Sequence, residues 1–354
     1  MGTSRQAGEA AGSSAGAVRC AVIGVGHLGR HHARLLGGLP GAELVALVDS
    51  DAERAAAVAE PLGVPVLSSA EQLPDDVAAV SVAVPTSAHQ AVVEPLLRRG
   101  MHVLVEKPMA ATLDQARSME ALARERGLVL HVGHVERFNP ALAAFRDLDA
   151  RPRFIEAHRL APFNYRTLDT SVVMDLMIHD IDIVLSLARA PLASVDAVGS
   201  RVLGEHVDIA SARLTFEDGC VANLTASRVS FEPMRKTRVF ADEAFVSMDL
   251  GSRKAFVVRK EPGFDLGSLD ATAMATVEPK DTFREFVSQG LLALDEYDLD
   301  SPDANPLRDE LAAFVAEVAG GPSGAGVDGK AGLAAMELAA AVSESMAAHR
   351  WTDG

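Results

Sequence analysis

The chain is short of cysteine, of positive charge and of long apolar runs, and each shortage narrows what it can be. Its 354 residues include 2 cysteines, Cys20 and Cys220, which lie far apart in apolar stretches. Buried free thiols are the usual state of such residues, so we expect a reducing, cytoplasmic environment. No apolar run reaches the roughly 18 residues of a membrane-spanning helix, so no membrane partner is expected.

The charge balance is acidic. Lys and Arg number 33 against 49 Asp and Glu, which gives a formal net charge of −16. Because binding to nucleic acid requires a basic surface, no nucleic-acid partner is expected. Residues 1–17 are small and polar, so we expect a disordered tail. They also lack the roughly 7–15 apolar residues of a secretory signal.

The first informative motif of the sequence lies in the stretch Val18–Arg34, VRCAVIGVGHLGRHHAR. An apolar strand pattern is followed by three glycines in the spacing G-x-G-x-x-G and then by a helical pattern. In that context the glycines permit a tight turn, close approach of a pyrophosphate and close packing of helix on strand. The helix N-terminus attracts phosphate. The predicted cofactor-binding residues of this stretch are Gly24, Gly26, His27, Leu28 and Gly29.

A second apolar strand, ELVALVD, ends at Asp49, 25 residues after Gly24. A carboxylate about 20 residues beyond such a turn holds the ribose diol of a dinucleotide. It would repel the 2′-phosphate of NADP. The predicted cofactor is therefore NAD.

From Val18 to about Val135 apolar strands alternate with helices, which predicts a doubly wound parallel sheet, the Rossmann fold. Beyond about residue 150 the runs alternate with period 2, and Asp218-Gly219 marks a hairpin, so a mostly antiparallel sheet is expected. We predict an α/β protein with a Rossmann domain followed by an α+β domain. Its parts are a tail (1–17), a cofactor domain (18–136), a domain for substrate binding and oligomerisation (137–330), an irregular excursion within it (261–305), and a helix (331–349) that packs back on the cofactor domain.

Ligands of a parallel sheet lie beyond the carboxyl ends of its strands. Polar residues follow several predicted strands there, including a His-Val-Glu-Arg-Phe-Asn-Pro stretch at 134–140. Lys107 is the strongest candidate for chemistry, because the proline after it restricts its backbone. The further predicted cofactor-binding residues at this edge are Pro85, Thr86, His89, Glu106 and Lys107.

The predicted helix Thr170–Leu187 carries a histidine one turn from a carboxylate. At about 100° per residue, Asp175, His179, Asp182 and Ser186 fall on one narrow stripe. A histidine held by a carboxylate is suited to act as a general base. A buried structural histidine is the alternative interpretation of His179. Asp-x-x-x-His could also begin a metal site, but no further ligands follow at suitable spacing, so no metal is predicted.

Taken together, the motifs G-V-G-H-L-G, Glu106-Lys107-Pro108 and Asp175-x-x-x-His179 resemble the Gfo/Idh/MocA family of NAD(P)-dependent oxidoreductases, over about Val18–His349. The resemblance implies three catalytic residues. Lys107 would polarise the reacting hydroxyl, His179 would take its proton, and Asp175 would assist.

A narrower likeness covers V-G-H-V-E-R-F-N-P-A at 132–141, R-L-A-P-F at 159–163 and D-L-M-I-H-D-I-D-I-V-L at 175–185. These segments are similar to bacterial UDP-N-acetylglucosamine 3-dehydrogenases, which implies oxidation of the sugar C3 hydroxyl to a 3-keto sugar. The segment 261–305 resembles that subgroup less well. A dehydrogenase of inositol or of a free sugar stays open, as does a non-catalytic NAD-dependent sensor.

An anionic UDP-sugar needs local cations in so acidic a chain, and Arg can bind phosphate oxygens in a bidentate manner. An exposed sheet face also needs a cover, so we expect a homo-oligomer, a dimer or tetramer. The candidate substrate-binding residues are Arg137, Asn139, Arg159, Arg166 and Arg228, with Lys236 as a further cation.

Overall fold

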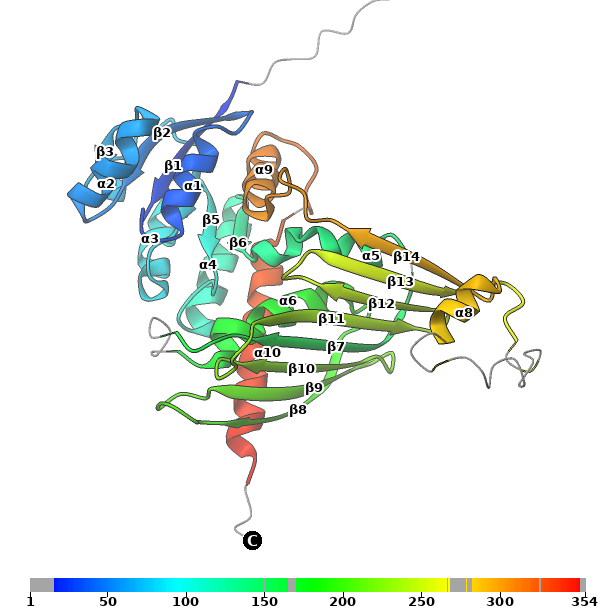
Figure 1. Ribbon diagram of the computed structural model, residues 1–354. Helices are drawn as coiled ribbons and strands as arrows, with labels where there is room; N and C mark the ends of the chain where they lie inside the picture. Colours follow the sequence, from blue (N-terminus) through cyan, green and yellow to red (C-terminus); the bar gives the residue numbers. More distant parts are fainter. Residues whose placement is uncertain are drawn as a thin grey trace, which may run out of the picture.

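The computed structural model of the chain describes residues 16–148, 150–164, 170–265, 267, 278, 282–324 and 326–350. It contains two sheets (Figure 1). A smaller sheet with helices on both faces is formed before residue 134, and a larger, more open sheet is formed by residues 152–298. Most of the predicted tail, residues 1–15, lies outside the described residues. Each described helix is too short or too polar to traverse a lipid bilayer.

The first sheet has six strands in the order β3-β2-β1-β4-β5-β6, and every pairing is parallel. The order reverses beside β1, which places a ligand site at the carboxyl ends of β1 and β4. The predicted Rossmann domain is thus confirmed. Its strands are β1 (Val18–Ile23), β2 (Ala42–Val48), β3 (Val66–Leu67), β4 (Ala79–Val82), β5 (His102–Glu106) and β6 (Leu130–Gly133), and its helices α1 (Gly29–Leu36), α2 (Ala52–Ala59), α3 (His89–Arg98) and α4 (Leu113–Arg126).

The second sheet has eight strands in the order β14-β13-β12-β11-β7-β10-β9-β8. The β7–β10 pair is parallel and the others are antiparallel, which confirms the predicted mostly antiparallel sheet. The β9–β10 hairpin turns at Gly219, whose φ is +85°. The strands are β7 (Pro152–Leu160), β8 (Leu192–Ser200), β9 (Ile209–Phe216), β10 (Val221–Ser227), β11 (Met234–Ala241), β12 (Ala244–Asp249), β13 (Lys254–Lys260) and β14 (Leu292–Asp298).

The expectation that 261–305 is irregular is wrong for its second half. This segment contains α8 (Thr282–Ser288) and the edge strand β14. The acidic side chains of β14 pair with basic ones of β13: Asp298 lies 3.1 Å from Lys254, and Asp295 pairs with Arg259. Cross-strand charge pairs of this kind stabilise a sheet, but they depend on a partner strand that local periodicity cannot show.

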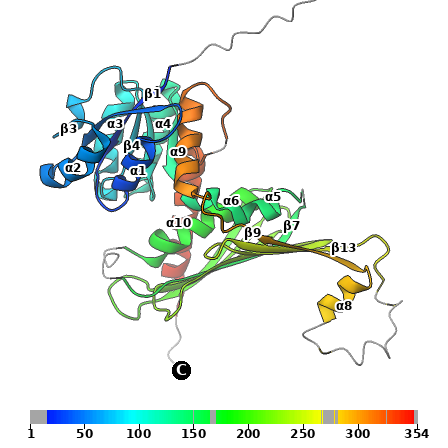
Figure 2. The same ribbon diagram turned by 45° about the horizontal axis from the view of Figure 1, so that its top comes forward.

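Two helices near the end of the sequence join the sheets. α9 (Pro306–Val318) packs on α1 and on the short helix η4 (Val135–Phe138). α10 (Gly329–Ala348) packs on α4 and β6 of the first sheet and on β8 of the second. Figure 2 shows α6 (Ile178–Leu187) and α10 on one face of the large sheet. A single apolar core therefore runs from the parallel sheet through α10 to the large sheet.

Candidate active site

The turn between β1 and α1 uses its glycines in two ways. Gly24 has a φ of +83°, and a Cβ there would lie 2.8 Å from the backbone of Ala83. A Cβ on Gly29 would lie 1.7 Å from the carbonyl oxygen of Gly24. Around a Cβ on Gly26, by contrast, there is no described atom within 4 Å. The first and third glycines close the turn, and the second leaves the backbone open to a ligand.

A cavity of about 990 Å³ opens beside this turn. Its walls come from the glycine turn, the end of β2, the segment 68–71 and residues of the segment 83–95. We call this cavity the cofactor cleft. Apolar walls with a few placed polar groups are typical of a small-molecule site. The predicted cofactor-binding residues that line it are Gly24, Gly26, His27, Leu28, Asp49 and Pro85.

Asp49 is a fixed carboxylate on the wall of the cofactor cleft, and it is 8% exposed. Its oxygens accept hydrogen bonds from the amides of Val25 at 2.8 Å and Asp51 at 2.9 Å, and from Arg54 Nη2 at 2.7 Å. Burial alone would raise the pKa of Asp49, but these hydrogen bonds outweigh it and hold the pKa below its ordinary value. The cleft therefore presents a carboxylate that is ionised at neutral pH, and its contact with a ribose diol stays a prediction.

His89 and Thr86 lie at the exit of β4. Thr86 begins the short helix η3 (Thr86–Ala88). His89 is buried, and its Nε2 lies 3.0 Å from the carbonyl oxygen of Val84 while Nδ1 lies 3.1 Å from that of Pro108. Burial lowers the pKa of His89. The ring therefore ties the exits of β4 and β5 together, and its contact with a cofactor stays a prediction.

Glu106 ends β5 and is held from two sides. Its Oε1 lies 2.9 Å from Nε2 of the buried His32, whose Nδ1 lies 2.8 Å from the hydroxyl of Ser81. Its Oε2 accepts a hydrogen bond from the amide of Lys107 at 3.2 Å. The carboxylate thus fixes the backbone from which Lys107 projects.

Lys107 reaches from the end of β5 to the second domain. Its Nζ donates to the carbonyl oxygen of Asp175 at 2.8 Å and lies 3.7 Å from the Asp175 carboxylate. Burial lowers the pKa of Lys107, and the charges of Asp175 and Glu106 oppose that effect. A lysine whose pKa is lowered at a sheet edge can polarise a hydroxyl or share its proton.

The helix that carries Asp175 and His179 changes form between them. Residues Val173–Met177 (η7) form a π-helical turn, and α6 continues as a regular α-helix. A π turn displaces the side chains that precede it from a 100° series, and such turns occur often at functional sites. Asp175 is therefore displaced from the predicted stripe, whereas His179, Asp182 and Ser186 lie on one face of the regular helix α6, along which Asp182 is 1% exposed and Ser186 faces solvent.

His179 is partly exposed, but its Nδ1 is buried without a hydrogen-bond partner in the described part of the chain. The carboxylate of Asp175 lies beside Lys107 instead. Burial, reinforced by the positive charges of Lys107 and Arg159, lowers the pKa of His179 well below its ordinary value. The ring is thus neutral at neutral pH, which is the state that a general base requires.

Four charged residues form a network beside this site, which we call the charge cluster: the buried Arg159, Asp180 and Glu136 and the exposed Arg235. Arg159 on β7 is 3% exposed and donates to both carboxylate oxygens of Asp180 at 2.9 Å and to Glu136 at 3.0 Å. Arg235 on β11 donates to Glu136 at 3.3 Å. Because a buried charge is costly without a partner, Arg159 compensates two carboxylates in this structure.

Arg137 and Asn139 also bind protein groups. Arg137 donates to both carboxylate oxygens of Asp182, at 2.6 and 3.0 Å. Asn139 is buried and donates to the carbonyl oxygen of Leu250 at 2.9 Å. Both residues fasten the segment after β6 to the second domain, and their contact with substrate stays a prediction.

Arg228 follows β10 directly and is 2% exposed. It donates to Asp208 at 2.7 Å and to the carbonyl oxygen of Thr170 at 2.7 Å. Its role toward substrate stays a prediction as well. Arg166 lies outside the described residues.

Some residues of the site were not predicted: Arg54, His134, Arg235 and Glu310. Arg54 has a local signal, since it lies one turn into the helix that follows Asp49. His134 was noted only as one of several polar residues after a strand. Arg235 and Glu310 come from β11 and α9, and no local pattern links them to the rest. Among the described residues, no group of three or more His, Cys, Asp or Glu side chains is placed to hold a metal ion.

Two family models match the sequence. Residues 18–134 match an oxidoreductase family described as having an NAD-binding Rossmann fold, and residues 146–247 match the GFO/IDH/MocA C-terminal domain. The open turn at Gly26 and the fixed Asp49 suit the dinucleotide that this family model specifies.

Individual proteins match as well. UDP-N-acetylglucosamine 3-dehydrogenase from Acidithiobacillus ferrooxidans is 42% identical over 247 residues, 70% of this chain and 78% of that protein. A solved structure of UDP-N-acetylglucosamine 3-dehydrogenase from that organism superimposes with a TM-score of 0.79 at 34% identity, covering 94% of this chain and 98% of the other. The NAD(+)-dependent scyllo-inositol 2-dehydrogenase of Bacillus subtilis is 34% identical over 233 residues, 60% of this chain and 68% of that protein.

Proposed function

The chain belongs to the GFO/IDH/MocA family of oxidoreductases and is an NAD-dependent sugar dehydrogenase, and within that class we propose that it oxidises the C3 hydroxyl of UDP-N-acetylglucosamine to the 3-keto sugar. The 42% identity to a dehydrogenase of that name supports the substrate. The observation that carries the reaction is the meeting of Lys107 with the π turn that leads into His179. We further propose that residues 18–136 bind the cofactor and residues 137–330 bind the sugar.

Three side chains, those of Lys107, His179 and Asp175, act in the proposed reaction. Bound NAD⁺ supplies the hydride acceptor. Lys107, held by Asp175, donates a hydrogen bond to the C3 hydroxyl and so favours the developing oxyanion. His179 is neutral and takes the hydroxyl proton, a contribution of about 10²–10⁴ in rate. Asp175 acts through Lys107 rather than through His179, whereas their spacing on the helix had predicted a carboxylate that holds the histidine.

The diphosphate of the substrate requires cations that can be reached. The side chain of Arg235 is 54% exposed and that of Lys236 is 40% exposed. Arg159 and Arg228 would have to leave buried carboxylates to bind it, whereas Arg137 keeps 20% of its side chain exposed. We therefore place Arg235 and Arg137 nearest the diphosphate, with Asn139, Arg159, Arg166 and Arg228 in supporting positions. Lys236, the next residue of β11, points to the opposite face of the sheet, where it lies 3.6 Å from Asp249.

The test of this function is direct. The purified full chain is mixed with NAD⁺ and UDP-N-acetylglucosamine, and NADH absorbance is followed with an aminotransferase present to remove the 3-keto product. We expect turnover that depends on the nucleotide sugar, with free N-acetylglucosamine and scyllo-inositol as controls. Faster turnover of scyllo-inositol would replace the proposed substrate. NAD⁺ binding without oxidation of any of these alcohols would favour the sensor.

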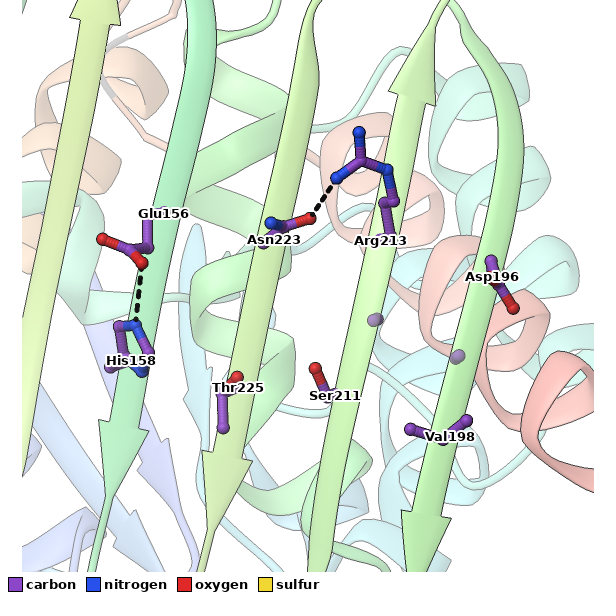
Figure 3. Close-up of a pocket in the computed structure, with 10 residues that line it drawn as sticks. Glu156, His158, Asp196, Val198, Ser211, Arg213, Asn223 and Thr225 are labelled. Carbon is purple, nitrogen blue, oxygen red and sulfur yellow. Dashed lines mark hydrogen bonds and ion pairs between the residues drawn. The ribbon is translucent and has the colours of Figure 1, made fainter. Parts of the chain in front are cut away.

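We also propose a homo-oligomer that forms through the face of the large sheet opposite α6. One half of this face is polar and holds a hollow of about 390 Å³. Figure 3 shows Glu156 beside His158 and Arg213 hydrogen-bonded to Asn223 in this hollow. The other half carries an aromatic row across four strands with neighbouring ring centroids 4.7–5.7 Å apart, formed by Phe154, Phe240, Phe245 and Phe256.

A second copy of this face would supply both apolar cover and charge partners, as two-fold interfaces do. Sedimentation of the full chain is expected to give a dimer or tetramer, and Phe240→Asp together with Phe256→Asp is expected to shift it toward monomer. A wild-type chain that sediments as monomer at all concentrations contradicts this. We also propose a cytoplasmic location, because Cys20 and Cys220 are buried free thiols.

A further inference from the structure

His134 is a buried histidine beside the proposed base. It follows β6 directly, is 1% exposed, and neither of its ring nitrogens has a hydrogen-bond partner in the described part of the chain. Its ring meets that of His179 edge to face, with 6.3 Å between ring centroids and 85° between planes. Buried polar atoms are rarely left without a partner, so this pair of rings requires an explanation.

His179 lacks the acceptor that a catalytic histidine normally has. A histidine base usually donates the N–H of its other ring nitrogen to a fixed acceptor, which selects the tautomer. Asp175 was expected to fill this role, but its carbonyl oxygen accepts from Lys107 and its carboxylate lies 3.7 Å from the same Nζ. Nδ1 of His179 is buried and has no partner among the described residues. The polar group packed against this ring is His134.

We propose that His134 is a positioning residue for His179, and that one of its ring nitrogens accepts the Nδ1–H of His179 directly or across one water molecule. Nε2 of His179 is then the unprotonated nitrogen. In the reaction the hydroxyl O–H bond breaks, an N–H bond forms at Nε2, and the hydride passes to NAD⁺. The inference rests on the proposed function for its substrate and on the two rings for its geometry.

The distance between the rings suits this arrangement. A direct bond requires the two nitrogens to lie about 3 Å apart. A centroid separation of 6.3 Å suits one bridging water molecule, because each ring nitrogen lies only about 1 Å from its own centroid, and a direct bond would require the two rings to approach by about 1 Å. An edge-to-face contact is also a favoured arrangement of two rings, so packing and hydrogen bonding act together.

Burial is the main factor that favours two neutral rings, and charges of both signs surround them. His134 is faced by Asp182 from α6, by Lys107 and Glu106 from β5 and by Arg137 from η4, and burial lowers its pKa. Besides His134, the charges that face His179 come from Lys107, Arg159 and Arg235. On the α9 side, Glu310 lies near Glu106 and Asp182. Two neutral imidazoles can donate and accept in series, which two imidazolium ions cannot.

The test compares His134→Phe, which keeps a ring but removes the acceptor, with His134→Gln, which restores an acceptor. His131→Gln is the matched control, because His131 lies on β6, is 2% exposed and pairs with Glu317 at 3.0 Å. We expect His134→Phe to lower kcat about 10- to 100-fold, with KM and the Kd for NAD⁺ nearly unchanged. His134→Gln should recover part of the loss.

The acid limb of kcat/KM in His134→Phe should move to lower pH, because the imidazolium of His179 loses a stabilising acceptor and its pKa falls. Equal losses in His134→Phe and His134→Gln, or an unmoved acid limb, would overturn the proposal. A loss of NAD⁺ binding in both variants would do the same, since it would indicate a structural role.

A measurement without substrate separates this inference from the proposed function. Nitrogen NMR of the wild-type chain with labelled histidine, assigned with the variants, reports the tautomer of His179. We expect a neutral ring protonated at Nδ1 in the wild type and a mixture of tautomers in His134→Phe. Protonation at Nε2 in the wild type would overturn the proposal even if UDP-N-acetylglucosamine is the substrate. A His179 ring protonated at Nδ1 would support the proposal even if another sugar is the substrate.

Discussion

At the cofactor cleft the chain presents backbone, one fixed carboxylate and open space, whereas at the charge cluster it presents side chains that neutralise one another. The cleft of about 990 Å³ lies between the glycine turn, the end of β2 and the segments 68–71 and 83–95, all within the first sheet's domain. The charge cluster joins β7, α6, β11 and η4, and both Arg159 and Asp180 are less than 5% exposed. One region is arranged to receive a ligand, and the other is arranged to hold two domains in register.

The comparison shows which cations of an acidic enzyme are available to bind a ligand. A buried arginine with a bidentate carboxylate is already satisfied, so its presence near a site does not make it a ligand. Lys107 and His179 differ from it, because Nδ1 of His179 has no partner in the described part of the chain and Lys107 binds chiefly a carbonyl oxygen. The chemistry is expected where the polar groups are incompletely paired.

The largest effect is expected from the incompletely paired residues. Lys107→Met and His179→Asn should each lower kcat about 10²–10⁴-fold, because each removes a group that acts on the reacting hydroxyl. Steady-state kinetics with fluorescence titration of NAD⁺ checks this. The Kd for NAD⁺ should change little, and if it collapses in both variants the two residues support the fold and not the reaction.

A substitution in the charge cluster should lower the free energy of unfolding. Arg159→Ala leaves Asp180 and Glu136 buried without their cation and should lower the free energy of unfolding by about 3–5 kcal/mol. The matched control is Arg153→Ala, whose partner Asp242 lies 2.7 Å away on the surface, with an expected loss of about 0–1 kcal/mol. Denaturant titration measures both. Similar losses in the two variants would remove the distinction between the regions.

Asp49→Asn tests the cleft itself. The amide can still accept from the amide of Val25, but the charge is lost and Arg54 loses its closest partner. We expect the Kd for NAD⁺ to rise about 10-fold and the preference over NADP⁺ to fall, since Arg54 could then face a 2′-phosphate. Asp51→Asn is the control on the same segment. An unchanged preference would show that Asp49 does not set it.

The smallest effect is expected at Glu310, a buried carboxyl whose oxygens have no described partner. Burial, together with the charges of Glu106 and Asp182, raises its pKa well above the ordinary value. The folded chain therefore holds a proton there that the unfolded chain releases above about pH 4.5, so wild-type stability is lost as pH rises from that value. Glu310→Gln keeps the neutral shape without that loss.

The melting temperature of Glu310→Gln should thus exceed that of the wild type by a few degrees at pH 8 and match it near pH 4.5, at about 2–4 °C per kcal/mol. Asp309→Asn, on the exposed side of the same helix, should show no such dependence. A difference that grows toward acid would mean that Glu310 is ionised in the folded chain.

How far the sequence leads depends on how local the determinant is. The turn at Gly24–Gly29 and Asp49 lie within one β-α-β unit, so their spacing predicts a cofactor seat. Lys107 was indicated by its place after a predicted strand and before a proline, and His179 by its spacing from Asp175, while their roles came from the family resemblance. The pairing of Arg159 with Asp180 has no local signal, because it arises only when β7 and α6 pack. The π turn before His179 could not be predicted from a fixed angle of 100° per residue. Strand β14 could not be predicted either, because its charged residues are stabilised by pairing with a partner strand.

The path of α10 has a consequence for biosynthesis. This helix covers α4 and β6 of one sheet and β8 of the other, and Ser345 near its end accepts a hydrogen bond from the amide of Ala197. Nascent chains commonly fold from the N-terminus while synthesis proceeds at about 5–20 residues per second. Here the apolar surfaces that α10 covers stay exposed until residues 329–348 have left the ribosome. These surfaces therefore need protection from aggregation during most of the time that the described chain takes to be synthesised.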